Sequence, residues 1–206
     1  MRLSTILILS LFLVHTMNAQ TNNVEHISMI TTPVLLLNRD TVVSQGTGFY
    51  YALQDSTKNA NIIFLVTNYH VLTGSAPNEK KPPIGDNIIF FFHKDQKNTG
   101  ELKQVRFPLF TKLKDPIWIS SKNYPDADVA IVPLLSGLYQ DCKVFGISEE
   151  WTKAPIKLRP TSRVTLVGYP YGYEDKTNAL PIWKTGSIAS EPNVDFSGKP
   201  LFVVDV

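Results

Sequence analysis

The chain has a single cysteine, Cys142, and little excess charge of either sign. One cysteine cannot form a disulfide within the chain, and it cannot supply the several thiolates of the usual structural zinc sites. The 20 lysines and arginines face 18 acidic residues, so the formal net charge is only +2. Because nucleic-acid binding depends on a strong basic field, this balance predicts no nucleic-acid partner.

The sequence also lacks an apolar run long enough to cross a membrane as a helix. The run Ile6–Val14 has about nine residues, against the roughly 20 that a bilayer requires. It follows Arg2 and precedes a polar stretch ending in Ala19, which is typical of a secretory signal peptide over residues 1–19. An uncleaved N-terminal anchor helix is the alternative. Because Gln20 stands where a lipoprotein has cysteine, we expect a secreted or periplasmic protein with no membrane partner after cleavage.

What the sequence does contain is an ordinary globular composition, with 43% hydrophobic and 18% charged residues. Apolar residues come in short β-branched or aromatic runs between clusters of Gly, Pro, Asn and Asp, with almost no helical period. We therefore predict an all-β protein built as a sandwich or as barrels. The expected strands are Met29–Leu37, Thr47–Leu53, Ile62–Thr67, Asn87–His93, Leu102–Leu109, Ile117–Ser120, Val129–Pro133, Val164–Tyr169, Ile182–Ser190 and Leu201–Val206.

The stretch between Pro133 and Val164 differs in composition from its surroundings. It contains Gly137 and the prolines Pro155 and Pro160, and it has no strand pattern. We interpret residues 136–162 as a connection between two packed units, one over residues 28–135 and the other over residues 163–206.

A candidate general base stands at the end of a predicted strand. His70 directly follows the run Ile62–Tyr69, at a strand-to-turn corner where one ring face can be buried and the other can meet a substrate. Imidazole changes its protonation between about pH 5 and 8, so this histidine suits general-base chemistry. A histidine that only satisfies structural hydrogen bonds is the alternative.

Two further segments carry candidate functional residues. Asp126 and Asp128 precede the apolar strand Val129–Pro133, where a carboxylate needs a partner if it is buried. Alternatively, both are turn residues beside Pro125. The segment Gly46-Thr47-Gly48 opens a strand with a glycine pair, which permits close backbone approach but also occurs in many plain β-turns.

In combination and in this order, Gly46–Phe49, Val66–Val71 and Asp128–Val132 resemble the trypsin-like (chymotrypsin-fold) serine proteases, specifically their secreted bacterial branch without disulfides. The similarity continues through Val164–Gly172, Leu180–Ser190 and Gly198–Asp205, and so covers roughly residues 29–206. The resemblance implies an all-β fold of two barrels, the first over 28–135 and an incomplete second over 163–206. It also implies a polypeptide substrate and no cofactor.

The resemblance assigns catalytic roles to His70 and Asp128. The histidine would take the proton from a serine hydroxyl as it attacks a peptide carbonyl, and the aspartate would accept a hydrogen bond from the other ring nitrogen. Asp128 is preferred to Asp126 because it directly precedes the apolar strand, where the family has its acid.

The nucleophile is the point where the sequence departs from the family. The family's serine lies in a Gly-x-Ser-Gly loop after a strand that corresponds to Leu201–Asp205, and the sequence given stops at Val206. We therefore expect a fragment that ends before its nucleophile, is inactive by itself and leaves apolar side chains of the second unit poorly covered. A non-catalytic binding module with the protease fold, outside the cytoplasm, is the alternative, and a generic extracytoplasmic β-domain with coincidental motifs is a third.

Ser197 imitates the nucleophile loop without matching it. Phe196 precedes it, Lys199 stands where the family needs glycine, and the segment comes before the strand that should precede the nucleophile. We expect a surface turn there. His26 and His93 have no metal-ligand spacing with each other or with a nearby acid, so no metal site is predicted.

Overall fold

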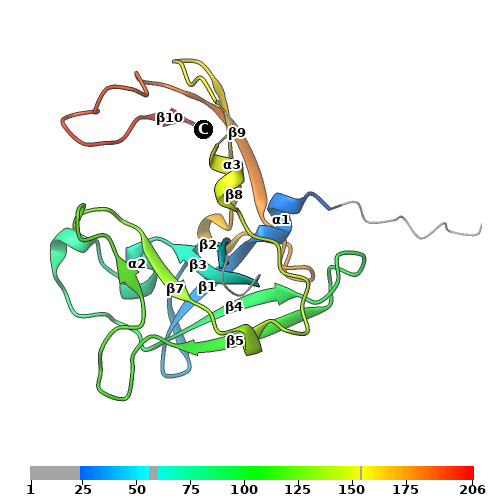
Figure 1. Ribbon diagram of the computed structural model, residues 1–206. Helices are drawn as coiled ribbons and strands as arrows, with labels where there is room; N and C mark the ends of the chain where they lie inside the picture. Colours follow the sequence, from blue (N-terminus) through cyan, green and yellow to red (C-terminus); the bar gives the residue numbers. More distant parts are fainter. Residues whose placement is uncertain (1–23, 56–59, 154) are drawn as a thin grey trace, which may run out of the picture.

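The computed structural model describes residues 24–206 except 56–59 and 154, so the predicted signal peptide at 1–19 lies outside the described residues. The fold consists mainly of a seven-stranded sheet and a separate three-stranded sheet, both antiparallel (Figure 1). The all-β prediction is therefore confirmed. Within the described part of the chain, no helix combines the length and apolarity needed to cross a membrane.

The seven-stranded sheet has the order β5-β4-β1-β2-β3-β7-β6. Its strands are β1 (Thr31–Asn38), β2 (Thr41–Asp55), β3 (Ala60–Thr67), β4 (Asn87–His93), β5 (Leu102–Pro108), β6 (Ile119–Ser120) and β7 (Ala130–Pro133). The second sheet, in the order β10-β9-β8, contains β8 (Arg163–Gly168), β9 (Ile182–Ile188) and β10 (Val204–Asp205). The helices are α1 (His26–Ile30), α2 (Tyr69–Thr73) and α3 (Glu149–Thr152), with 3₁₀ turns η1 (Pro77–Glu79), η2 (Ser136–Leu138) and η3 (Pro170–Gly172).

Each predicted strand has a counterpart, but some bounds differ and three short helices were not expected. The predicted strand Met29–Leu37 is wrong at its start, because Met29 and Ile30 belong to α1. β2 begins at Thr41 rather than Thr47, because the turn at Arg39 and Asp40 folds the chain straight back onto β1. Arg39 has the left-handed φ of 57° that such a tight hairpin turn requires. The histidine expected at a strand-to-turn corner instead lies in the first turn of α2.

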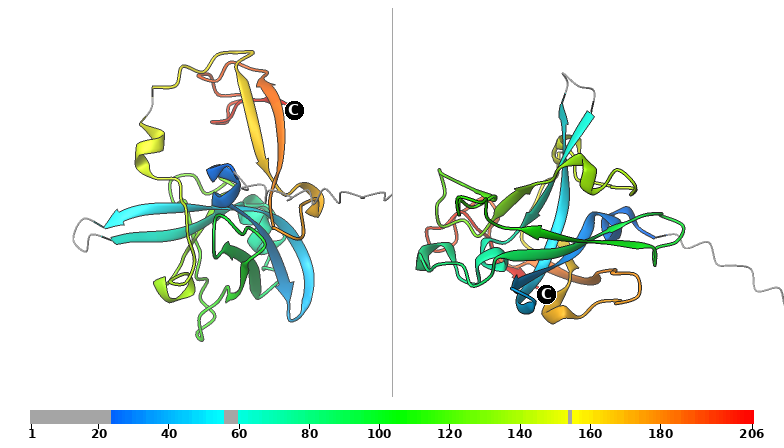
Figure 2. Two further views of the ribbon diagram at one scale, coloured as in Figure 1. Left: turned by 90° about the vertical axis from the view of Figure 1, so that its right-hand side faces the viewer. Right: turned by 90° about the horizontal axis from the view of Figure 1, so that it is seen from below.

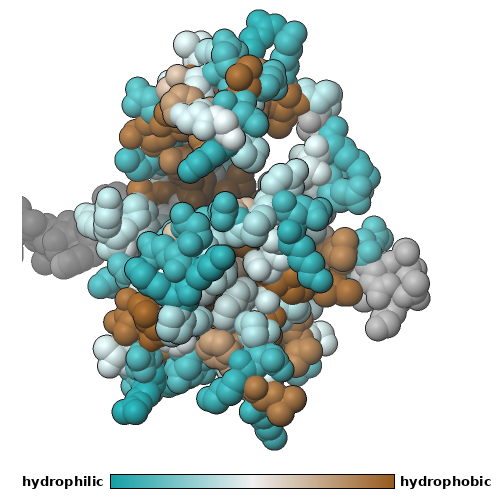
Figure 3. Space-filling model, turned by 90° about the vertical axis from the view of Figure 1, so that its left-hand side faces the viewer, coloured by the Kyte–Doolittle hydropathy of each residue, from teal (hydrophilic) through white to brown (hydrophobic). Residues whose placement is uncertain are grey.

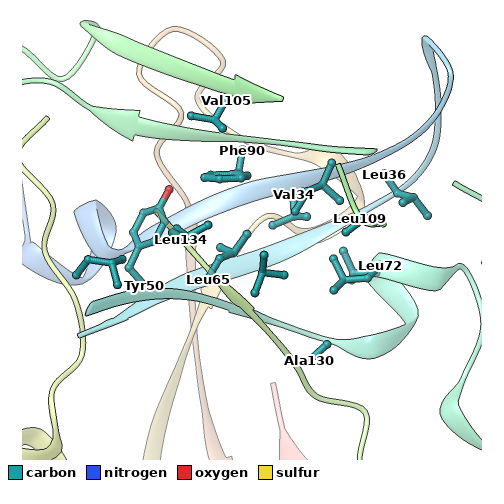
Figure 4. Close-up of a cluster of buried hydrophobic side chains, with 14 of the residues drawn as sticks. Val34, Leu36, Tyr50, Leu65, Leu72, Phe90, Val105, Leu109, Ala130 and Leu134 are labelled. Carbon is teal, nitrogen blue, oxygen red and sulfur yellow. The ribbon is translucent and has the colours of Figure 1, made fainter. Parts of the chain in front are cut away.

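The hydrophobic core fills the inner side of the curved seven-stranded sheet, between β4–β5 and β2–β3 (Figure 4). β4 shows why the sequence folds this way, because Ile88, Phe90 and Phe92 are buried while the residues between them are only half-buried. The ring of Tyr50 stacks on Phe92 at 4.8 Å between centroids, and its hydroxyl donates to the Phe91 carbonyl at 2.6 Å. Each fully buried side chain of this size contributes about 1.5–3 kcal/mol.

The two edge strands of the seven-stranded sheet approach each other around this core. Leu109 follows β5, and its carbonyl accepts a hydrogen bond of 2.8 Å from the amide of Ile117, just before β6. Phe110 and Pro116 form an isolated bridge next to it. The sheet is therefore strongly curved, and its edge strands β5 and β6 come close together. Within the described residues, the segments next to these strands are connected by the Leu109–Ile117 hydrogen bond and the Phe110–Pro116 bridge, and β5 and β6 do not pair with each other.

The three-stranded sheet extends away from the seven-stranded sheet, as Figure 1 and the left panel of Figure 2 show. Its register places a set of apolar side chains on one face. Ile188 is buried, contrary to the expectation of poor covering, whereas Leu166 is 51% exposed. Hydrophobic surface is visible on this upper part of the molecule, above a hollow that separates it from the body (Figure 3). That face carries the apolar side chains of Val164, Leu166, Ile182, Ile188 and Val204, and Lys184 lies among them, opposite Leu166.

Tyr169, directly after β8, joins the second sheet to the first. Its amide donates to the Thr47 hydroxyl at 2.9 Å, and its buried phenol donates to the Ala179 carbonyl at 2.7 Å. Burial raises the pKa of the Tyr169 phenol, so the side chain remains a neutral donor. Trp183 of β9 adds a second contact, donating from its indole nitrogen to the Ser28 hydroxyl at 3.0 Å.

The glycine pair Gly46 and Gly48 allows the backbone of β2 to approach side chains of α2, β1 and β3 closely. A Cβ added at Gly46 would lie 2.4 Å from a methyl carbon of Val71 in α2. At Gly48 it would lie 2.7 Å from Leu65 and 2.8 Å from Val34. Val71 is buried and β-branched, so its side chain has few other rotamers in which to avoid the added methyl group. Close backbone approach, one of the two expectations for this segment, is what the structure shows.

Replacing Gly46 with alanine should destabilise the protein by about 1–3 kcal/mol, because the new methyl group overpacks the contact between β2 and α2. The measurement is the free energy of unfolding in urea. Gly137→Ala is the matched control, since its added Cβ would meet nothing within 4 Å. Equal stability of the two variants would contradict the close-approach explanation.

Candidate active site

Strand pairing brings the two predicted site residues together. β3 pairs with β7 in antiparallel register, with Thr67 opposite Ala130. His70 follows β3 closely, in the first turn of α2, and Asp128 lies two residues before Ala130. Residues that are 58 positions apart in the sequence thus meet at one end of the sheet.

His70 and Asp128 form two hydrogen bonds. The ring Nδ1 lies 2.5 Å from Asp128 Oδ2, and the main-chain amide of His70 donates to Asp128 Oδ1 at 2.9 Å. A carboxylate can only accept here, so the ring proton is assigned to Nδ1 and the lone pair to Nε2. One carboxylate therefore fixes both the orientation and the tautomer of the imidazole.

The His70 side chain is partly exposed to solvent. The side chains of His70 and Asp128 are 50% and 38% exposed, and no hydrogen bond to Nε2 is formed by any described residue. A neutral ring whose Nε2 lone pair is not engaged by a described residue can accept a proton from an incoming or neighbouring hydroxyl group. The arrangement thus suits a general base.

The hydrophobic core holds α2, the helix that carries His70, in place. Val71 and Leu72 of α2 are buried, and Tyr69 meets the ring of Trp118 edge to face at 6.4 Å. Trp118 in turn contacts Phe110 at 5.4 Å between centroids. α2 is short, but these contacts anchor it to a rigid scaffold, as precise positioning of a functional side chain requires.

Asp126, the other acid considered, lies apart from the histidine's hydrogen-bond network. It is exposed and forms no hydrogen bond or ion pair with another described residue. A hydrogen bond of 2.9 Å from Ala127 to the Tyr124 carbonyl closes the turn that contains Asp126. The turn interpretation thus applies to Asp126, and Asp128 is the acid that partners His70.

Asn68 is a site residue that the sequence reasoning missed. Its side-chain amide donates to the main-chain carbonyl of Asp128 at 2.9 Å and approaches Oδ2 at 3.4 Å. The available signal was weak, because an asparagine before a short helix normally indicates only a cap.

Ser197 lies in an exposed turn and forms no hydrogen bond with His70. Its φ is 54°, the φ of Gly198 is 72°, and the Lys199 amide donates to the Phe196 carbonyl at 3.2 Å. Two successive left-handed residues in a tight turn are typical of a hairpin connection. This backbone is a chain reversal, and the surface turn expected at Ser197 is confirmed.

The other two described histidines have structural contacts. His26 stacks on Phe145 with 4.7 Å between centroids. His93, at the end of β4, is buried, and its Nε2 donates to the Asn178 carbonyl at 2.8 Å. Because desolvation disfavours the charged ring, burial lowers the pKa of His93. Among the described residues, no three His, Cys, Asp or Glu side chains are grouped as metal ligands would be.

No protein-family model matches the chain, and no curated protein matches it.

The lowered pKa of His93 predicts a stability that falls on acidification. The unfolded chain binds the imidazole proton near pH 6.5, whereas the folded protein binds it only at lower pH. The unfolded state therefore holds more protons in that window, and the free energy of unfolding decreases as the pH falls below about 6.5, by at most about 1.4 kcal/mol per pH unit.

The measurement is urea unfolding at a series of pH values between about 7 and 5. His93→Gln, which keeps a side-chain donor but cannot titrate, should flatten the dependence. An identical slope for both proteins would show that His93 is not responsible.

Proposed function

We propose that this protein is a serine endopeptidase of the trypsin-like family that acts on polypeptides outside the cytoplasm. The observation that carries the proposal is the 2.5 Å contact between His70 Nδ1 and Asp128 Oδ2, in a histidine side chain that is half-exposed and whose Nε2 is bonded to no described residue. The resemblance to the family points to His70 and Asp128 as catalytic residues, and their side chains form a hydrogen bond in the structure.

The chemistry follows from the tautomer. His70 Nε2 would accept the proton of a serine hydroxyl as the oxygen attacks the peptide carbonyl, and the ring would become an imidazolium. Asp128 would stabilise that positive charge through Oδ2 while its Oδ1 holds the helix amide. The imidazolium would then give its proton to the leaving amine, which breaks the peptide bond, restores the base and leaves an acyl ester on the serine. A water molecule activated by the same base would hydrolyse that ester and regenerate the serine hydroxyl.

We also propose that the two sheets correspond to the two barrels of this family. The curling of the seven-stranded sheet, with its ends linked at Leu109 and Ile117, supports a first barrel over residues 28–135. The three-stranded sheet supports a second barrel over 163–206, because one of its faces carries apolar side chains, of which Leu166 stays exposed. Residues 136–162 would connect the two.

The nucleophile in this proposal is the serine that the resemblance expects after β10. The alternative, a non-catalytic module that binds proteins, keeps the same fold and needs no nucleophile. The two proposals differ in what happens when the base is removed, since only the peptidase loses an activity.

The decisive variants are His70→Ala and Asp128→Asn in the full-length protein, meaning a chain that includes the serine proposed after β10. His70→Ala should lower kcat by about four to six orders of magnitude, and Asp128→Asn by about four, because the base is lost or its tautomer is wrong. Hydrolysis by the unmodified protein should also slow as the pH is lowered, since a protonated imidazole cannot accept the serine proton. The measurement is steady-state peptide hydrolysis.

His26→Ala and Asp126→Asn are the matched controls, because they make the same changes outside the hydrogen-bonded pair. Both should retain kcat. Full hydrolysis by His70→Ala would refute the peptidase proposal. A full-length protein without any peptidase activity, but with a protein ligand, would favour the binding module.

A further inference from the structure

The residue before α2 does not use its side chain as a helix cap. Asn68 occupies the N-cap position with an extended backbone, φ −72° and ψ 145°, yet forms no side-chain capping hydrogen bond. An asparagine at this position ordinarily accepts from the amide of the second or third helical residue. Asn68 therefore does not follow the usual capping preference of asparagine, and its side chain instead forms a hydrogen bond outside the helix.

Asp128 performs the capping in its place. The second residue of α2 is His70, and its amide donates to Asp128 Oδ1 at 2.9 Å. A carboxylate near a helix N-terminus is also favoured by the partial positive charge of the unpaired amides. The Asn68 amide group meanwhile points at Asp128, with 2.9 Å to the main-chain carbonyl and 3.4 Å to Oδ2.

We propose that Asn68 is a positioning residue that holds Asp128 against the His70 ring. The anchor to the main-chain carbonyl fixes the backbone of Asp128, so it does not depend on the state of the carboxylate. The fixation matters because the Asp128 side chain is 38% exposed, so water competes for its oxygens. The importance of Asn68 for catalysis rests on the proposed function, whereas its hold on Asp128 does not.

Two substitutions separate positioning from capping, because serine and aspartate cap helices about as well as asparagine. In Asn68→Ser the side chain is uncharged and ends about one bond short of the amide nitrogen. In Asn68→Asp the shape is retained, but the donor is replaced by an acceptor that repels Asp128. A residue needed only as a cap would tolerate both changes, and a positioning residue would tolerate neither.

The readout is proton NMR of the full chain with ¹⁵N-labelled histidine, which needs no substrate. His70→Ala identifies the Nδ1 proton of His70, and its rate of exchange with water reports the hydrogen bond to Asp128. The Nε2 proton of His93, bonded to the Asn178 carbonyl, is an internal reference in the same spectrum. Asn61→Asp, an exposed change of the same charge on β3, is the matched control.

We expect exchange of the His70 proton to accelerate at least about tenfold in Asn68→Ser and Asn68→Asp, the factor that one charge-assisted hydrogen bond is worth. The His93 proton and the Asn61→Asp control should keep their rates. An unchanged His70 rate in either Asn68 variant would overturn the proposal. So would parallel loss of the His70 and His93 signals in both variants, because Asn68 would then support the whole fold.

Hydrolysis by the full-length protein gives a second, independent readout. If the peptidase proposal holds, both Asn68 variants should lower kcat with KM unchanged. Faster proton exchange in a protein without peptidase activity would preserve the positioning role of Asn68 while refuting the proposed function.

Discussion

The antiparallel pairing of β3 with β7 is the constraint on which the candidate site depends. It sets Thr67 opposite Ala130 and so aligns the end of one strand with the beginning of the other. A shift of one residue would turn the buried side chains of β7, Ala130 and Val132, toward solvent. The register that buries the β7 side chains therefore also brings Asp128 to His70. A change in this strand pairing would disrupt the hydrophobic core and the candidate site together.

A second constraint acts through α2. The helix has only five residues, too few to be stable in isolation, and it is held by the burial of Val71 and Leu72 against the sheet. The missing side chain at Gly46 makes room for Val71, and the Asp128 carboxylate satisfies the amide of His70. The buried side chains of α2 and the hydrogen bond from the His70 amide to the Asp128 carboxylate together hold the imidazole in place, although the helix is short.

The sequence predicted the strands well because their apolar runs are short, β-branched or aromatic, and bounded by turn residues. Asn87–His93 was predicted to the residue, since its alternating burial is a local property of the strand. The helices α1, α2 and α3 were missed because four or five residues are too few to show a helical period in the sequence. His70 and Asp128 were found through the order of motifs, whereas Asn68 could not be, because its role depends on which partner its amide meets across the β3–β7 pairing.

The distance along the chain between the two halves of the site has a consequence for folding. His70 and Asp128 are 58 positions apart, and the β4–β5 hairpin lies between them. Closing so long a loop costs more chain entropy than forming the β1–β2 or β4–β5 hairpins, whose contacts are local. On this ground we expect the local hairpins to form before β3 pairs with β7, and the contact between imidazole and carboxylate to form only with that pairing. The pair is thus a marker of this one long-range pairing, because a chain that holds only its local hairpins leaves the base without its acid.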